Sequence, residues 1–267
     1  NVALKISRAA DSDAFEVAGR GELQLAVLIE SMRREGFELG VSRPKVVMQK
    51  DPVTGETLEP IEEVVIDVDD EHSGVVVQKL SERRADLLEM RPSSAGRTRL
   101  VFHAPTRGLI GYRGELLSDT RGTAVMNRLF HAYAPHKGEI KGRHTGVLIS
   151  NGSGESVAFA MWNLEDRGPM MIEVGIKVYE GMIIGEHTRG NDLEVNVLKG
   201  KKLTNVRASG TDEAVRLTTP IRMTLEKALA YIQDDELVEV TPENIRLRKV
   251  YLDPNDRKRF SRASVDA

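Results

Sequence analysis

A basic, polar stretch between residues 198 and 217 holds the side chains best suited to bind an anion. Its first half carries four cations and no carboxylate, and its second half begins with small hydrogen-bonding residues. Point charges and short donors of this kind suit the oxygen atoms of phosphates. The apolar alternation of the flanking segments stops here, so we expect a long polar loop. The candidate anion-binding residues of this stretch are Lys199, Lys201, Lys202 and Arg207, together with the polar residues Ser209 and Asp212.

This interpretation of the loop has an alternative. Composition by itself favours an ordinary solvated hairpin tip, because most loops lie on the protein surface. A polar loop of this length inside a compact domain is uncommon unless it is functional or disordered. Both interpretations stay open on the loop residues alone.

The distribution of charge along the chain is uneven, although the net charge is only −3. Residues 56–71 contain eight acids and no Lys or Arg, whereas residues 246–262 contain seven bases against Asp253 and Asp256. Such separation can orient a protein on a polyanion, and ordinary surface variation explains it about equally well. A second cluster of bases near residue 140 fits either a phosphate contact or a plain interdomain linker. The secondary RNA-binding candidates are Lys137, Lys141, Arg143, Arg257, Lys258 and Arg259.

Several common kinds of site are excluded by their missing motifs. A phosphate-binding loop of the form G-x-x-x-x-G-K-[ST] is absent, because Val195 and Lys202 occupy two of its required positions. The run that begins at Asp67 lacks the sixth-position glycine of a calcium loop. The acidic run at 234–236 follows a predicted helix and is interpreted as a solvated turn. We therefore expect no catalytic residue and no metal site in this chain.

The absence of cysteine favours a reducing compartment, and we expect the protein in the cytoplasm. No apolar run reaches the roughly 18 residues of a membrane span, and no signal peptide is recognisable. The chain begins with Asn1 in the middle of an apolar alternation, so we expect a fragment of a longer protein.

Hydrophobic periodicity predicts an α+β protein with three parts. Residues 1–52 follow a β-β-α-β order and are interpreted as the latter part of a ferredoxin-like domain. Residues 53–135 contain a complete β-α-β-β-α-β pattern, with helices predicted over 75–84 and 109–117. Residues 136–267 are predicted to form a β-rich domain with one main helix near residues 225–232 and the long basic loop.

Within this last part, short strands are predicted at 146–150, 157–162, 173–178, 183–186, 193–198, 237–240 and 245–250. Asp253 and Pro254 are predicted to begin a final basic helix, since Asp is a good N-cap and Pro suits the first helical position. The ferredoxin-like pattern also suggests an RNA-recognition domain that stacks bases on sheet aromatics. The chain is only 4% aromatic and lacks that motif in 100–104, so we reject that mode of reading bases.

Longer segments of the sequence resemble the elongation factor G family of translational GTPases. GRGELQL (19–25) and SRPKVVM (42–48) are similar to the third domain of that factor, and RGLIGYRGELLSDTRGTAVMNRLFHAY (107–133) is similar to its fifth domain. The continuation, with VLISNGSGESVAFAMWNLEDRG, VYEGMIIGEHTRGNDLEVNVLKGKKLTNVRASGTDEAV and PIRMTLEKALAYIQDDELVEVTPENIRLRK, resembles the BipA (TypA) family in particular. The resemblance covers essentially the whole chain.

The resemblance implies a C-terminal half of a ribosome-associated GTPase linked to stress adaptation and large-subunit assembly. GTP and its magnesium ion would bind in an upstream domain that is absent from this sequence. The family's C-terminal loop, which matches 199–215 here, is expected to contact ribosomal RNA and the acceptor end of A-site tRNA. The resemblance therefore implies that the RNA-binding residues are Lys199, Lys201, Lys202, Arg207, Ser209 and Asp212. We expect a monomer without membrane or DNA partners. The alternatives are a structural or oligomerising fragment and, less favoured, an enzyme acting on RNA or a phosphate ester.

Overall fold

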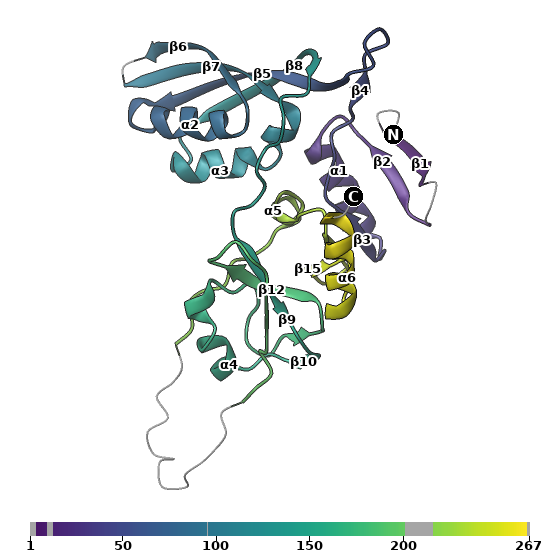
Figure 1. Ribbon diagram of the computed structural model, residues 1–267. Helices are drawn as coiled ribbons and strands as arrows, with labels where there is room; N and C mark the ends of the chain where they lie inside the picture. The colour runs from purple at the N-terminus through teal and green to yellow at the C-terminus, as the bar shows by residue number, and fades with distance from the viewer. Residues whose placement is uncertain (1–3, 10–12, 95, 201–215, 266–267) are drawn as a thin grey trace. The chain divides into compact units, whose positions relative to one another are not determined.

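The computed structural model describes residues 4–9, 13–94, 96–200 and 216–265 of the chain. The chain forms two compact units (Figure 1). Unit 1 consists of Asn1–Arg43 and Arg143–Ala267, and unit 2 consists of Pro44–Gly142. The fold is α+β, as predicted from the sequence. The domain boundaries predicted at residues 52 and 135 stay predictions.

Unit 2 has the ferredoxin-like order of elements predicted from its hydrophobic periodicity. Its four long strands form an antiparallel sheet in the order β8-β5-β7-β6, and a short strand β4 pairs with the start of β5. The elements are β4 (Gln49–Lys50), β5 (Thr57–Asp69), α2 (Asp70–Glu82), β6 (Asp86–Ser94), β7 (Arg97–Pro105), α3 (Tyr112–Asp119) and β8 (Val125–Pro135).

The core of unit 2 lies between the sheet and the two helices α2 and α3, which cover one of its faces (Figure 1). Val64, Ile66 and Val68 alternate along β5 and are fully buried, which is the period-2 pattern of a strand with one covered face. Phe102 of β7 packs into the same cluster. Helix α2 begins earlier than predicted, at Asp70, because two acidic residues in its first turn suit the helix dipole.

Helix α3 also differs from its predicted range of 109–117. Residues 106–109 form a separate 3₁₀ turn (η1, Thr106–Leu109), and the α-helix starts only at Tyr112. Gly111 between them has a φ of 72°, a left-handed conformation that favours glycine and interrupts the helical path. The single helix predicted over 109–117 is therefore replaced by the end of the 3₁₀ turn and the separate helix α3.

Unit 1 is built on a six-stranded sheet with the strand order β13-β9-β12-β15-β14-β3. The β13–β9 pair is parallel and the other pairs are antiparallel. Its strands are β3 (Leu39–Ser42), β9 (Gly146–Ser150), β12 (Met182–His187), β13 (Leu193–Val195), β14 (Glu236–Val240) and β15 (Ile245–Lys249).

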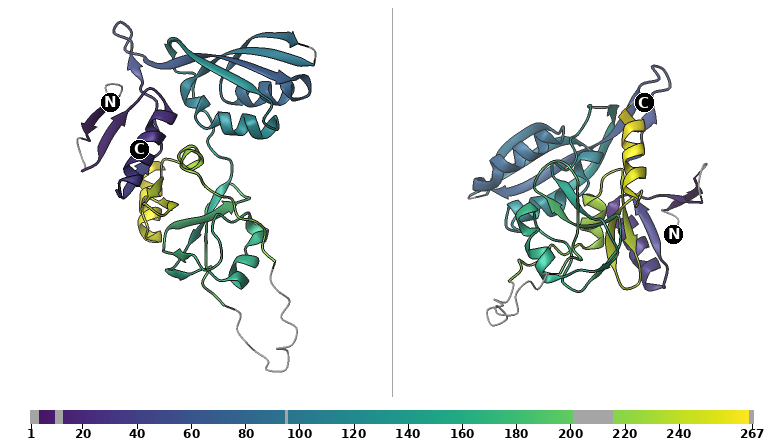
Figure 2. Two further views of the ribbon diagram at one scale, coloured as in Figure 1. Left: turned by 180° about the vertical axis from the view of Figure 1, so that it is seen from behind. Right: turned by 60° about the horizontal axis from the view of Figure 1, so that its bottom comes forward.

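The N-terminal segment follows the predicted β-β-α-β order. β1 (Lys5–Arg8) and β2 (Phe15–Ala18) form a two-stranded ribbon beside α1 (Glu22–Arg34), as Figures 1 and 2 show. The fourth element, β3, pairs with β14 and not with this ribbon.

Two predicted strands of unit 1 are wrong. Residues 158–162 form a helix, α4 (Ala158–Trp162), and most of 173–178 is irregular. Only β11 (Lys177–Val178) is a strand in that second stretch, paired with β10 (Gly154–Glu155). A short apolar run does not distinguish a buried helix from a strand, and α4 buries Ala160 and Met161 through one helical face.

The two later helices of unit 1 agree with the sequence predictions. Helix α5 (Leu225–Tyr231) is capped by Thr224, whose hydroxyl accepts a hydrogen bond from the amide of Lys227. Helix α6 (Pro254–Val265) begins after Asp253, whose carboxylate accepts the amides of Asn255 and Asp256 at 2.6 and 3.3 Å. No helix in the described ranges is long and apolar enough to cross a membrane.

Candidate nucleic-acid interface

The residues that lead into the basic stretch, 196–200, form an outgoing arm that is held at its start by hydrogen bonds. After β13, the buried residue Val197 accepts a hydrogen bond from the amide of Val157 at 2.9 Å. Asn196 accepts the amide of Leu198 at 2.9 Å through its side chain. The exposed Lys199 follows Leu198 directly, so its backbone continues from this hydrogen-bonded segment.

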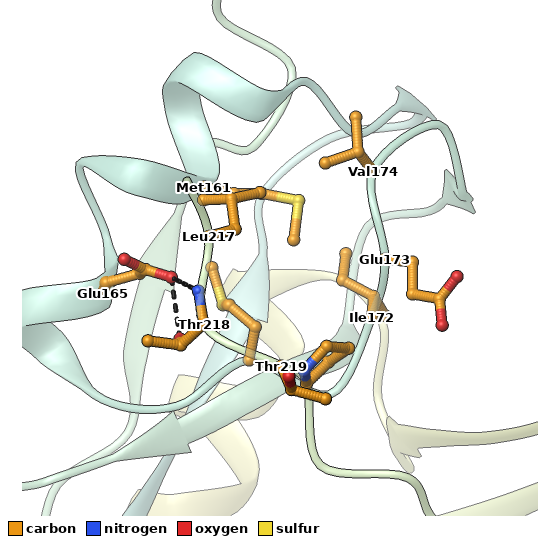
Figure 3. A pocket seen from close by; sticks show the side chains of 10 residues that line it. Met161, Glu165, Ile172, Glu173, Val174, Leu217, Thr218 and Thr219 are labelled. Atoms are coloured by element: carbon orange, nitrogen blue, oxygen red, sulfur yellow. Dashed lines mark hydrogen bonds between the residues drawn. The ribbon is translucent and has the colours of Figure 1, made fainter. Parts of the chain in front are cut away.

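The return arm, residues 216–224, is held at several points. The amide and the hydroxyl of Thr218 both donate to one carboxylate oxygen of Glu165, at 2.6 and 2.7 Å (Figure 3). The amide of Ile221 donates to the carbonyl of Met170 at 2.7 Å. Arg216, exposed at the start of this arm, is the counterpart of Lys199 on the outgoing arm. Both ends of the stretch are therefore anchored and carry cations.

A pocket of about 300 Å³ lies beside the return arm (Figure 3). Its lining is mainly apolar, with the carboxylates of Glu165 and Glu173 as its charged groups. Carboxylates repel phosphate, so the pocket does not suit the RNA backbone. The lining residues are Met161, Glu165, Met170, Ile172, Glu173, Val174, Leu217, Thr218, Thr219 and Pro220.

One of the six candidate loop residues lies in the part of the chain that the structure describes. Lys199 is described and exposed. The other five, Lys201, Lys202, Arg207, Ser209 and Asp212, lie outside the described residues. Their role in RNA binding stays a prediction. The sequence did not predict a role for Glu165, which accepts both hydrogen bonds from Thr218. The two residues are 53 positions apart, and no local sequence pattern marks Glu165.

The secondary candidates fall into two groups by exposure. Lys141, Lys258 and Arg259 are exposed, although Arg259 also contacts Asp256 at 3.4 Å. Arg257 donates to Glu194 at 2.9 Å and to two backbone carbonyls before α6, so its charge is used within unit 1. Within the exposed group, Arg259 would have to exchange its contact with Asp256 for a phosphate, whereas Arg257 would have to give up several contacts inside unit 1.

Lys137 is held inside unit 2 by acidic partners. Its ammonium group contacts Asp86, and its amide donates to Glu59 at 2.7 Å. Glu59 is 1% exposed and also binds the guanidinium of Arg107. Burial by itself raises the pKa of Glu59, but the hydrogen bonds from Arg107 and the Lys137 amide outweigh it, so the pKa lies below its ordinary value of 4.5.

This arrangement predicts a specific acid sensitivity of unit 2. A carboxyl group with a lowered pKa in the folded state stabilises the fold above pH 4.5, and that stability is lost as pH falls through the folded pKa. We expect amide exchange in β5 and β8, measured at pH 3 to 7 and corrected for intrinsic rates, to accelerate below about pH 4.5. The variant Glu59→Gln should flatten this dependence, whereas Glu56→Gln, at an exposed position, should leave it unchanged. An unchanged profile in Glu59→Gln would contradict the assignment.

Arg143 belongs to a buried charge network in unit 1. Its guanidinium donates to Glu236 at 2.9 Å and lies 4.3 Å from the centre of the Tyr231 ring. Glu236 also accepts from Lys249 at 3.0 Å, and Lys249 contacts Asp192 and Asp235 at 2.6 and 2.8 Å. The network therefore joins the start of β14, the end of β15 and the connection before β13.

The pKa values of the two cations in this network are set by burial and by the three neighbouring carboxylates, which act in opposite directions. Burial by itself lowers the pKa of Lys249, but the surrounding carboxylates of Glu236, Asp192 and Asp235 raise it above its ordinary value of 10.5. Burial likewise opposes the charge of Arg143, and Glu236 raises its pKa. The predicted solvated turn at 234–236 is wrong for Glu236, whose side chain is 0% exposed. Within the described residues, no three His, Asp or Glu side chains are grouped so that they could hold a metal ion.

Comparisons with known proteins match both units to established families. Residues 145–254 match the TypA/BipA C-terminal domain, and residues 56–144 match the elongation factor G C-terminus. The chain is 56% identical over all 267 residues to the protein of Escherichia coli (strain K12) named "Large ribosomal subunit assembly factor BipA", of which it covers 44%. It is 52% identical over 266 residues to the protein of that name from Haemophilus influenzae, covering 99% of this chain and 43% of the relative.

A third relative with that name, from Buchnera aphidicola, is 51% identical over 263 residues, covering 98% of this chain and 43% of the relative. The chain therefore spans less than half the length of the curated relatives it matches. The match of residues 56–144 to the elongation factor G C-terminus agrees with the ferredoxin-like unit described above. The chain belongs to the TypA/BipA family and carries its elongation factor G-like C-terminal region and its TypA/BipA C-terminal domain.

Proposed function

We propose that this chain is the RNA-contacting part of a ribosome-bound translational GTPase. In this proposal the basic loop contacts ribosomal RNA of the large subunit and the acceptor end of A-site tRNA. The observation that carries the proposal is the anchoring of both loop arms, with exposed cations at Lys199 and Arg216. Fixed arms reduce the conformational entropy lost when a loop binds.

The relatives named as large-subunit assembly factors support the choice of partner. The parent protein would act in ribosome assembly and stress adaptation in the cytoplasm, and this chain would be monomeric. GTP hydrolysis would belong to another part of the parent, because this sequence lacks the phosphate-binding loop motif. The exposed bases Lys141, Lys258 and Arg259 would supply secondary phosphate contacts.

Co-sedimentation with large ribosomal subunits across a salt series tests the proposal. Each phosphate contact contributes roughly −0.7 to −0.9 to the slope of log K against log salt concentration. If all four cations contact phosphates, replacing Lys199, Lys201, Lys202 and Arg207 by alanine should therefore make the slope shallower by roughly 3 to 4. A matched control removes four exposed lysines elsewhere, at 45, 50, 177 and 227, and should change the slope by less than about 1.

Equal slopes for the two quadruple variants would show that loop charge is not specifically recognised. Binding of the unaltered chain that does not depend on salt would reject phosphate contact altogether. Sedimentation equilibrium of the same samples separates the oligomerisation alternative, which requires a concentration-dependent mass.

A further inference from the structure

Helix α1 contributes to the core of the loop-bearing unit, although it lies more than 100 residues before that core in the sequence. Ala26 and Ile29 are 5% and 9% exposed. They join one apolar cluster with buried residues of β9, β12, α5, β14 and β15. The neighbouring face of α1 is different, because Leu23 and Val27 are 59% and 58% exposed. The helix is therefore docked through one face only.

Strand β3 and the end of α1 add two further kinds of contact. β3 pairs with β14 over four residues, from Leu39 opposite Val240 to Ser42 opposite Leu237. It thereby covers the backbone of a strand that would otherwise form the edge of the sheet. Arg33 donates to the carbonyl of Pro242, just beyond β14, at 2.7 Å. Apolar packing, backbone pairing of β3 with β14 and the hydrogen bond from Arg33 thus all join residues 22–42 to the later part of unit 1.

The element that α1 packs against leads directly to the basic loop. Helix α5 begins after Thr224, which ends the return arm 216–224. Met223 of that arm packs against the same apolar cluster as Ile29. Farther along the arm, Ile221 and Thr218 are tied to Met170 and Glu165. The packing contacts between α1 and α5 therefore continue, through Met223 and the hydrogen bonds of Ile221, along the return arm as far as Thr218.

We propose that residues 22–42 are an integral part of the loop-bearing domain, and that α1 docked on α5 holds the return arm of the basic loop in place. The docking site is the surface formed by α5 and by the edge of β14, which the α1–β3 segment of this same chain covers. The match to the TypA/BipA C-terminal domain covers only 145–254. A domain that begins at residue 145 would therefore lack the core residues that α1 and β3 contribute.

Hydrogen exchange of the full 267-residue chain, measured without RNA, tests this inference independently of the proposed function. Ile29→Asp places a charge in the docked face of α1, and Val27→Asp places the same charge on its exposed face. We expect exchange in α5, β14 and residues 216–224 to become at least about tenfold faster in Ile29→Asp. In Val27→Asp the rates in these segments should stay within about twofold of the unaltered chain.

Ile29→Ala is the milder variant, which keeps the fold if Ile29→Asp unfolds unit 1. It should accelerate exchange in the same three segments by a smaller factor. The inference is overturned if α1 and β3 lose protection while α5 and 216–224 exchange at unaltered rates. It is equally overturned if the Val27 and Ile29 aspartate variants behave alike.

Discussion

Replacing Glu236 by glutamine is expected to lower the free energy of unfolding of unit 1 by about 3–5 kcal/mol. The glutamine has the same shape but carries no charge, and its NH₂ group would face donors on two sides. Lys249 keeps Asp192 and Asp235 as partners, whereas Arg143 loses the carboxylate that it binds at 2.9 Å. The cost is large because Arg143 stays charged in a largely buried site.

Denaturant unfolding followed by tryptophan fluorescence measures this effect, because the single tryptophan, Trp162, lies in unit 1. The matched control is Glu173→Gln, at an ion pair with Arg222 in which both side chains are more than half exposed. A surface pair of this kind contributes about 0–1 kcal/mol. If the two variants unfold at the same denaturant concentration, the network is not a stabilising centre of unit 1.

A double-mutant cycle separates the Arg143 contribution from the rest of the network. Arg143→Met removes the guanidinium and keeps an apolar stem against the Tyr231 ring. Combined with Glu236→Gln, it should cost less than the sum of the two single changes by about 0.5–3 kcal/mol. Strict additivity would mean that the Arg143–Glu236 contact is not coupled.

Replacing Gly146 by alanine is expected to destabilise unit 1 by about 3 kcal/mol, the upper end of the usual cost of overpacking. Gly146 begins the buried strand β9, and a Cβ there would lie 2.1 Å from the carbonyl oxygen of Asn191. The contact is with backbone, so no side-chain rotation relieves it. The amide of Gly146 also donates to the backbone carbonyl of Arg189 at 2.7 Å, which limits movement of the strand.

The control for this second variant is Gly40→Ala in β3, where an added Cβ meets no atom within 4 Å. Both changes put a methyl group on a strand of the same sheet, and only the first creates a clash. We expect a shift in the tryptophan-monitored midpoint for Gly146→Ala and a change within about 0.5 kcal/mol for Gly40→Ala. Equal midpoints would contradict the close approach of β9 and residue 191.

Local sequence patterns determined much of the architecture of this protein. The period-2 alternation along β5 and the helical spacing of α2 were sufficient to predict the ferredoxin-like order of unit 2. Asp253 and Pro254 marked the start of α6 because capping acts between neighbouring residues. The concentration of bases between 198 and 217 is likewise a property of the sequence, as is the family resemblance.

Tertiary structure alone decided which bases remain free and which strands pair. Lys137, Arg143 and Arg257 look alike as exposed cations in a sequence, yet each meets an acid between 51 and 93 positions away. The apolar run 158–162 became a helix and β3 joined β14, although neither outcome has a local signal. Burial, charge pairing and strand pairing depend on which distant segments meet, and that is determined when the whole chain packs.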